Sequence, residues 1–193
     1  MKFAIIGDYR SGKKSFATKI QYNQFDEEYE LNRGSTTYYV ESNTDLNPDF
    51  TIDFYYGFSG FNTFIHNQFN DSLMVVSCFL ILIPADGNPE STSNFVSSQI
   101  DKIRNHDEYS HIFILIVITK SDLEHKTIDF EEIDEISRNR DCLGCIEVSS
   151  KEMGRDDLID EISRNRDCLG CIEVSSKEMG RDDLIDEISL IWS

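Results

Sequence analysis

The sequence predicts an α/β protein built on a mostly parallel sheet with helices on both faces. Apolar, β-rich runs alternate along the chain with amphipathic segments of helical spacing. A glycine turn follows the first apolar run, at the point where a helix is expected to begin. The chain has 193 residues, enough for one domain with a sizeable core. We therefore expect a single domain over residues 1–193.

Six short segments rich in apolar and β-branched residues are the expected strands. The turn-rich segment Asn43–Asp49 separates the second from the third, which predicts an antiparallel hairpin. The other strands are joined by helical segments and are expected to be parallel. In chain order the expected strands are Lys2–Ile6, Thr37–Ser42, Phe50–Tyr56, Leu73–Ile83, Ile112–Thr119 and Cys145–Val148.

Five segments show the spacing of an amphipathic helix, with apolar residues on one face. We interpret these apolar stripes as core faces. In chain order the expected helices are Lys13–Gln24, Thr63–Asn70, Ser91–Arg104, Ile128–Arg138 and Asp182–Trp192.

The charge of the chain argues against several classes of partner. The chain has 36 acidic and 18 basic residues, a formal net charge of -18, so nucleic acids and anionic membrane surfaces are poor partners. Its apolar runs are shorter than the roughly 20 residues of a membrane helix. The N-terminus lacks a signal-peptide pattern, and the C-terminus lacks a cysteine for prenylation. We expect a cytoplasmic protein with reduced thiols and no direct membrane anchor.

A tandem repeat lies in the C-terminal third of the chain. Asp134–Ile159 recurs residue for residue as Asp160–Ile185, and the second copy follows the first directly. Each copy reads as a strand, a serine turn and a helix. We favour an added edge strand at Cys171–Val174 with one covering helix. The alternatives are that one copy takes the ancestral place while the other lies outside it, or that the two copies compete for that place.

The repeat also duplicates a pair of cysteines. Cys142 and Cys145 recur as Cys168 and Cys171, which superficially suggests four thiolates for zinc. The gap between the two pairs exceeds the usual spacing of a zinc site, and any duplicated Cys-x-x-Cys gives the same pattern. Buried small side chains entering a strand are the favoured interpretation, and we assign no metal site.

A glycine-rich turn between the first strand and the first helix fits the pattern Gly-x4-Gly-Lys. Its backbone N–H groups and the helix N-terminus favour an anion, and Lys13 is expected to reach the terminal phosphates of a nucleotide. A plain turn capped by Ser11 is the alternative. The predicted phosphate-binding residues are Gly7, Asp8, Tyr9, Arg10, Ser11, Gly12, Lys13, Lys14 and Ser15.

Two further segments suggest a guanine site. Asp122 follows the fifth strand in Thr119-Lys120-Ser121-Asp122, and a carboxylate can accept the two adjacent N–H groups of guanine. Lys120 would lay its aliphatic stem along the base. The turn Ser149-Ser150-Lys151 could offer backbone N–H groups to the base carbonyl. Ordinary solvated turns are the alternative for both segments.

Together these motifs resemble those of the small GTPases of the Ras and Rab superfamily, over the whole chain apart from the extra copy of the repeat. The resemblance implies a P-loop NTPase G domain that binds GTP and GDP. Thr119–Asp122 matches the Asn-Lys-x-Asp motif with Thr for Asn, and Ser149–Lys151 matches the Ser-Ala-Lys motif at the family's spacing. The guanine-binding residues that it implies are Phe25, Thr119, Lys120, Asp122, Leu123, Ser149, Ser150 and Lys151.

The departures from the family fall on metal and water chemistry. Lys14 stands where a hydroxyl ligand of Mg²⁺ is expected, and Ser15 comes one position late. Gly57 and Phe61 replace the acidic residue and the glutamine of the family's Asp-x-x-Gly-Gln segment. We assign no catalytic residue and expect nucleotide binding to depend only weakly on Mg²⁺. The residues assigned to the switch regions are Thr36, Thr37, Gly57, Gly60 and Phe61.

Three functions are compatible with these motifs. The first is a signalling or trafficking switch that binds guanine nucleotide and hydrolyses GTP weakly or not at all. The second is a pseudo-GTPase, a scaffold that holds the nucleotide or only the fold. The third, a P-loop kinase, is disfavoured because the segment after the fifth strand suits guanine.

Overall fold

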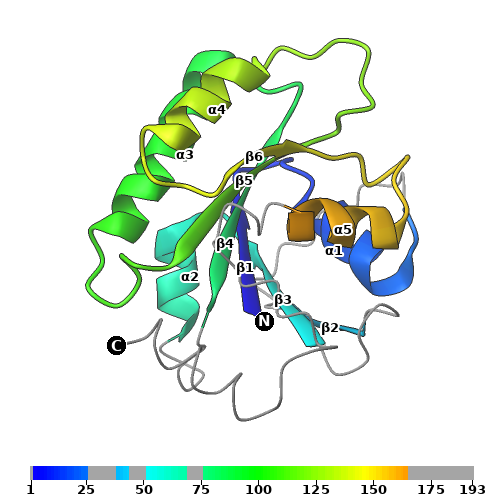
Figure 1. Cartoon of the computed structure of the whole chain (residues 1–193), viewed down its shortest axis with the longest axis horizontal. Coiled ribbons are helices and arrows are strands. Elements are labelled where there is room, and N and C mark those ends of the chain that lie inside the picture. Colours follow the sequence, from blue (N-terminus) through cyan, green and yellow to red (C-terminus); the bar gives the residue numbers. More distant parts are fainter. Residues whose placement is uncertain (1, 26–37, 44–50, 69–75, 165–193) are drawn as a thin grey trace, which may run out of the picture.

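A six-stranded sheet runs through the middle of the protein (Figure 1). The structure is a computed structural model that describes residues 2–25, 38–43, 51–68 and 76–164. The strand order is β2-β3-β1-β4-β5-β6, and β2 pairs antiparallel with β3 while the other pairs are parallel. The predicted fold class is therefore confirmed. The strands are β1 Lys2–Gly7, β2 Tyr38–Asn43, β3 Thr51–Phe58, β4 Cys78–Pro84, β5 Phe113–Thr119 and β6 Gly144–Glu147.

Each of the six predicted strands is present, and most of their bounds agree within two residues. β2 and β3 form the predicted hairpin, with Tyr39 opposite Tyr55. β4 begins at Cys78, later than the predicted start at Leu73, and residues 73–75 lie outside the described residues. β6 begins one residue earlier than predicted, because Gly144 already pairs with β5.

Helices cover both faces of the sheet, as predicted. Residues of α2, α3 and α4 pack in one apolar cluster, and residues of α1 and α5 pack in a second cluster on the opposite face (Figure 1). The helices are α1 Lys13–Tyr22, α2 Phe61–Gln68, α3 Pro89–Arg104, α4 Phe130–Arg138 and α5 Arg155–Arg164.

Local capping explains where several helices differ from prediction. α1 ends at Tyr22, because Asn23 takes the left-handed conformation with φ 53°. α3 begins at Pro89, two residues earlier than predicted, since the Asn88 side chain accepts the N–H of Ser91 at 3.0 Å. α4 begins after Ile128, because the Asp129 side chain caps its first turn. α2 begins at Phe61, two residues before the predicted Thr63.

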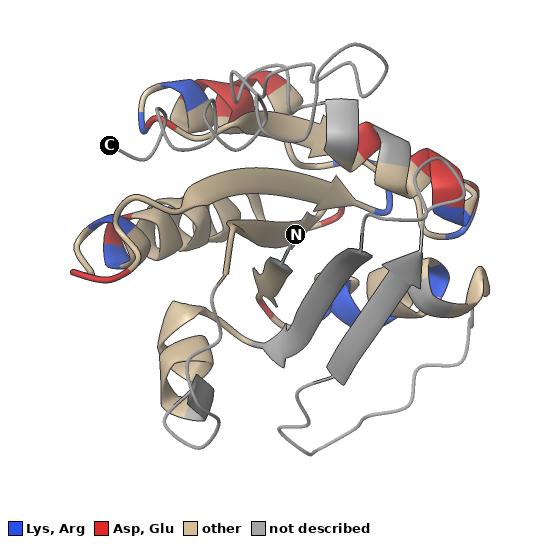
Figure 2. Ribbon diagram, turned by 60° about the horizontal axis from the view of Figure 1, so that its bottom comes forward, with Lys and Arg blue, Asp and Glu red and all other residues tan. Residues whose placement is uncertain are grey.

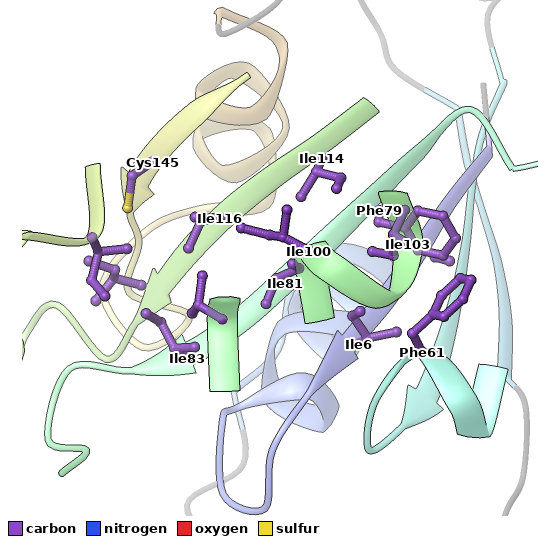
Figure 3. Packing of buried hydrophobic residues seen from close by; sticks show 14 of the residues in the cluster. Ile6, Phe61, Phe79, Ile81, Ile83, Ile100, Ile103, Ile114, Ile116 and Cys145 are labelled. Atoms are coloured by element: carbon purple, nitrogen blue, oxygen red, sulfur yellow. The ribbon is translucent and has the colours of Figure 1, made fainter. Parts of the chain in front are cut away.

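The larger apolar cluster lies between the sheet and helices α2, α3 and α4 (Figure 3). β4 and β5 supply isoleucines whose side chains are fully buried, including Ile81 and Ile116. Parallel strands covered on both faces are apolar along their whole length, which is why both runs lack polar alternation. The two clusters hold the carboxyl ends of the central strands in place, at the edge where the predicted site lies.

The first repeat copy occupies the end of the sheet. Its strand is β6, its serine turn follows, and its last residues begin α5, which continues to Arg164 with the first residues of the second copy. The predicted strand Cys171–Val174 and helix Asp182–Trp192 of the second copy lie outside the described residues. Among the described residues, no helix is long and apolar enough to cross a membrane.

Candidate functional site

The glycine-rich turn joins β1 to α1 at the carboxyl edge of the sheet. A Cβ atom on Gly7 would lie 2.5 Å from the carbonyl oxygen of Leu82 and 2.5 Å from Oγ of Ser11, so no larger residue fits there. Gly12 has φ 77°, a left-handed conformation that glycine adopts without strain. Both glycines of the sequence pattern are therefore required by the backbone of this loop, which we call the phosphate loop (residues 7–13).

Lys13 folds back over the phosphate loop. Its Nζ atom donates to the carbonyl oxygens of Gly7 and Asp8 at 2.6 and 2.7 Å, and to Oγ of Ser11 at 3.1 Å. Burial lowers the pKa of Lys13 from 10.5 to about 8, and the nearby Asp8 carboxylate partly opposes this shift. Ionised phosphate oxygens are stronger acceptors than carbonyl groups, so the ammonium group is suited to an anionic ligand.

The N-terminus of α1 carries an unusual distribution of charge. It has no acidic residue in its first turn, begins with Lys13 and Lys14, and receives no side-chain cap from Gly12. In Figure 2 the ribbon of α1 carries basic residues, whereas α4 and α5 carry mainly acidic ones. Lysines at a helix N-terminus oppose the macrodipole, and the uncapped N–H groups need acceptors. A bound anion would satisfy both requirements, so this end of α1 fits the phosphates of a nucleotide.

Three of the predicted phosphate-binding residues project from the loop or the first turn of α1. Tyr9 is 58% exposed, and the Arg10 guanidinium carbon lies 5.4 Å from the centroid of the Tyr9 ring. Arg10 itself has φ 61°, in the left-handed region. Lys14 is exposed, and Ser15 is half-buried.

Thr119 links β5 to the phosphate loop. Its buried hydroxyl lies 3.0 Å from the carbonyl oxygen of Ser11 and 3.1 Å from that of Ile83, within reach of a single donated proton. A Cβ atom on Gly12 would lie 3.2 Å from the same hydroxyl oxygen. Thr119 therefore joins the two loops.

Asp122 and the serine turn of the first copy meet beside Thr119. Oγ of Ser149 donates to Oδ1 of Asp122 at 2.7 Å, and the N–H of Ser121 donates to the carbonyl oxygen of Val148 at 3.1 Å. Ser149 and Ser150 are buried. The structure thus brings together the two segments that the sequence assigned to guanine, with the carboxylate of Asp122 held in position by a hydroxyl group.

Asp86 is a residue of the candidate site that the sequence analysis missed. Its carboxylate oxygens accept hydrogen bonds from Nζ of Lys120 at 2.9 and 3.1 Å. Asp86 follows β4, and Lys120 follows the neighbouring parallel strand β5, so the two side chains meet at the same edge of the sheet. That position at the end of a parallel strand is the signal by which Asp86 could have been found.

Phe61, which the sequence assigns to the switch regions, is buried in the apolar core. Its ring is 2% exposed and lies near Phe79 (Figure 3). The distances between ring centroids are at most 6.1 Å to Phe64, Phe79, His106 and Tyr109. The assignment of Phe61 to the switch regions stays a prediction, and the burial of its ring agrees with the expectation that it does not orient water. Phe61 is a core residue, because α2 begins there and turns the ring toward the sheet.

The backbone before α2 is fixed as well. The N–H of Phe61 donates to Oε1 of Gln99 at 2.8 Å, and a Cβ atom on Gly60 would lie 2.9 Å from that oxygen. Gly57 belongs to β3, so it lies in the sheet. The predicted switch residues Thr36 and Thr37 lie outside the described residues.

The remaining predicted guanine-binding residues lie around the meeting point of the two loops. Phe25 is 37% exposed and closes the first described segment, after α1. Leu123 is half-buried and Lys151 is exposed. The packing of Phe25 against guanine remains a prediction.

The described residues do not fit the usual Mg²⁺ site of a phosphate loop. Lys14, a cation, takes the position after Lys13, and Gly57 offers no carboxylate. Within the described residues, no group of three or more His, Cys, Asp or Glu side chains could hold a metal.

Cys145 is buried in the core, and burial raises the pKa of the half-buried Cys142 to about 11. Both thiols pack in or against the larger apolar cluster, and their counterparts Cys168 and Cys171 lie outside the described residues.

A cavity of about 210 Å³ lies between α2 and α3, away from the phosphate loop. It shares only Phe61 with the residues predicted for the site. It is lined by Phe61, Asn62, Ile65, His66, Lys102, Asn105 and His106.

Comparison with known proteins agrees with this geometry. A search of curated proteins finds no match to the chain. A family model described as Ras family matches residues 2–165, which includes the phosphate loop, the Asp122 loop and the first repeat copy. The chain therefore belongs to the Ras family of small GTP-binding proteins.

Proposed function

We propose that this protein binds guanine nucleotide with little dependence on Mg²⁺, acts as a signalling or trafficking switch, and hydrolyses GTP slowly or not at all. The observation that carries this proposal is Lys14, which stands exposed at the N-terminus of α1, directly after Lys13. An ammonium group there neutralises phosphate charge but cannot ligate a metal. The weak dependence on Mg²⁺ follows from Lys14, and the slow hydrolysis follows from the position of Phe61.

The weak dependence on Mg²⁺ follows from electrostatics. Two unit charges of like sign close together repel, and the repulsion grows as the local dielectric falls. Mg²⁺ would sit beside the Lys14 ammonium without its usual hydroxyl ligand. Ser15 lies one position further along α1, about 100° around the helix axis from Lys14, so its hydroxyl does not take the same place.

Slow hydrolysis follows from the residues available to position water. In phosphoryl transfer, the protein contributes mainly positioning and stabilisation of charge. The residue that starts α2 is Phe61, whose ring is buried in the core. No side chain at this position reaches the phosphate loop, so attacking water lacks an orienting group there.

A fixed scaffold is the second candidate function. One observation favours it: Gln99 and the surrounding aromatic rings hold the start of α2 in place. A segment held in this way presents the same surface with either nucleotide. The third candidate, a phosphate-loop kinase, is disfavoured by the Ser149 and Asp122 pair, which suits guanine rather than an adenine-specific site.

The nucleotide that co-purifies with the protein tests the proposal. The protein would be denatured after purification with and without a chelator, and the released nucleotide identified by chromatography. We expect GDP or GTP in both preparations, and none from a Lys13→Ala variant. Adenine nucleotide would contradict the guanine site, and loss of nucleotide on chelation would contradict the role given to Lys14.

A further inference from the structure

We propose that the cavity between α2 and α3 binds a small organic acid, with the carboxylate of the ligand at the mouth of the cavity and its apolar body on Phe61 and Ile65. Phe61 is the one lining residue that also belongs to the predicted nucleotide site. The inference does not rest on the proposed function, because no nucleotide takes part in it.

The inner part of the cavity is apolar. The Phe61 ring is 2% exposed, and Ile65 is half-buried against the larger apolar cluster. Neighbouring aromatic rings hold the Phe61 ring in place, so a ligand does not have to order it. An apolar body that covers this surface removes it from water, which favours binding.

The volume of the cavity limits the size of the ligand. A volume of about 210 Å³ holds about seven water-sized groups at roughly 30 Å³ each. Sites for drug-sized ligands are larger, typically about 300–1,000 Å³. The cavity therefore suits one ring or a short chain with a single head group, and it is too small for a nucleotide.

The mouth of the cavity is lined by hydrogen-bond donors. The exposed residues there are Asn62 and His66 from α2, and Lys102 and Asn105 from the end of α3. The ammonium group can only donate, and the amide and imidazole groups can each supply a donor. The chain has a net charge of -18, but the described residues that line this cavity include no Asp or Glu. An anion therefore meets no like charge on the cavity wall.

Lys102 is the charged residue near the end of α3 that remains for a ligand. Its neighbour Asp101 forms an ion pair with Arg140, which follows α4. Arg104 donates to two carbonyl oxygens of the segment before β5, at 2.9 and 2.7 Å. Both basic residues offset the partial negative charge of the last turn of α3. Among the described residues Lys102 takes part in no ion pair, so its ammonium group can pair with a ligand carboxylate.

His106 adds a donor between the mouth and the apolar part of the cavity. Its Nδ1 atom accepts the N–H of Glu108 at 3.3 Å, so the neutral ring carries its proton on Nε2. Its ring lies 5.4 Å from the ring of Phe61 and 5.0 Å from the ring of Tyr109, between centroids. His106 is half-buried, and a hydrogen bond to a carboxylate is stronger there than in open water.

Titration of the full chain with phenylpropionate, followed by backbone amide chemical shifts, tests the site. Phenylpropanol has the same body without the charge, and propionate has the charge without the body. We expect the signals of residues 61–66 and 102–106 to move with phenylpropionate, and both comparison compounds to bind at least about tenfold more weakly.

Three outcomes of this titration would overturn the proposal. Shifts confined to residues 7–15 would place the anion on the phosphate loop. Equal affinity for phenylpropanol would show that the cavity does not select a carboxylate. A flat titration up to tens of millimolar would leave the cavity to a peptide segment of a partner protein.

Two substitutions at the mouth separate the charge of the site from the stability of the fold. Lys102→Met keeps the length of the side chain and removes its charge, so phenylpropionate affinity should fall about threefold to tenfold, because the ammonium group is exposed. Asn62→Asp adds a carboxylate with little change of shape and should abolish binding. That carboxylate lies in the first turn of α2, where negative charge stabilises a helix, so the protein should stay folded.

Lys19→Met is the matched control, because it removes the same charge from α1 on the opposite face of the sheet. It should bind phenylpropionate as the unmodified protein does. Saturating phenylpropionate should also raise the thermal midpoint of these two proteins, but not that of Asn62→Asp. Unchanged affinity in both Lys102→Met and Asn62→Asp, with both variants folded, would overturn the proposal. Absence of GDP binding would contradict only the proposed function.

Discussion

The hydroxyl of Thr119 lies 3.0 Å from the carbonyl oxygen of Ser11, although 108 positions separate the two residues in the chain. Thr119 ends β5 and Ser11 belongs to the phosphate loop, so this contact couples the base side of the site to its phosphate side. Both residues are buried, where a hydrogen bond is costly to leave unmade. This hydrogen bond holds the two loops together.

Asp122→Ala should abolish the preference for guanine nucleotides. The alanine cannot accept the two N–H groups of the base, and charge-assisted hydrogen bonds contribute about 1.5–3 kcal/mol each. We expect GDP affinity to fall by on the order of 3–5 kcal/mol, measured by calorimetric titration with GDP and ADP. Glu124→Ala, an exposed acidic residue two positions away, is the control. Unchanged GDP affinity in Asp122→Ala would show that the base binds elsewhere.

Lys14→Ser combined with Gly57→Asp should make nucleotide binding dependent on Mg²⁺. The double change removes an ammonium group and supplies a hydroxyl and a carboxylate, both oxygen donors that Mg²⁺ prefers. Nucleotide release after addition of chelator measures the effect. We expect rapid release from the double variant and little release from the unmodified protein. Equal release from both would mean that Lys14 does not replace the metal.

Phe61→Gln should unfold or strongly destabilise the protein rather than restore hydrolysis. The ring is buried among four other aromatic rings, and loss of a buried Phe side chain costs about 3–5 kcal/mol. Urea denaturation followed by circular dichroism measures the free energy of unfolding. The exposed neighbour Asn62→Gln should leave that free energy within about 0.5 kcal/mol of the unmodified value. Unchanged stability in Phe61→Gln, with faster GTP hydrolysis, would contradict this prediction.

Nucleotide affinity should fall as the pH rises above about 8. Burial lowers the pKa of Lys13 to about 8, so above that pH the free protein loses the ammonium group that faces the phosphates. The unfolded chain keeps its proton up to 10.5, so the free energy of unfolding of the free protein should rise over the same window. Titration of GDP from pH 6.5 to about 9.5 tests this. Lys13→Gln should bind weakly at every pH.

Deletion of Asp160–Ile185 should leave a folded protein with a single copy of the repeat. The first copy supplies β6, the serine turn and the start of α5, and the deletion joins Ile159 directly to Asp186. The joined helix then reads through to Ile191 and Trp192 in one register. A cooperative thermal melt with a midpoint at or above that of the full chain is expected. A deleted protein without a transition would make the extra unit part of the core.

The sequence predicted the sheet and most of the helices because their signals are local. The apolar run of β5 and the stripe of α4 identify those elements without reference to distant residues. Capping also explains the differences in helix bounds, as at Asn88, whose side chain moves the start of α3. The predicted start at Ser91 follows the apolar pattern, which begins after this cap.

The parts of the candidate site that a local motif determines could be predicted from the sequence. The parts that depend on contacts between distant segments could not. The spacing of Gly7, Gly12 and Lys13 required the loop that the structure contains. The burial of Phe61 depends on rings contributed by β4 and the segment after α3, far away in the chain, so the motif alone could not predict it. Asp86 was missed for the same reason, because its partner lies on the next strand.

The attachment of α2 to α3 limits how far GTP and GDP could give this protein different conformations at α2. A ligand shifts a conformational equilibrium only by the difference between its affinities for the two forms. Any form in which Phe61 leaves its aromatic neighbours must lose that packing and the hydrogen bond to Gln99. GTP would have to prefer such a form over GDP by several kcal/mol to populate it. If GTP has no such preference, a partner that binds the surface around α2 responds to the concentration of this protein. It does not distinguish the GTP-bound from the GDP-bound form.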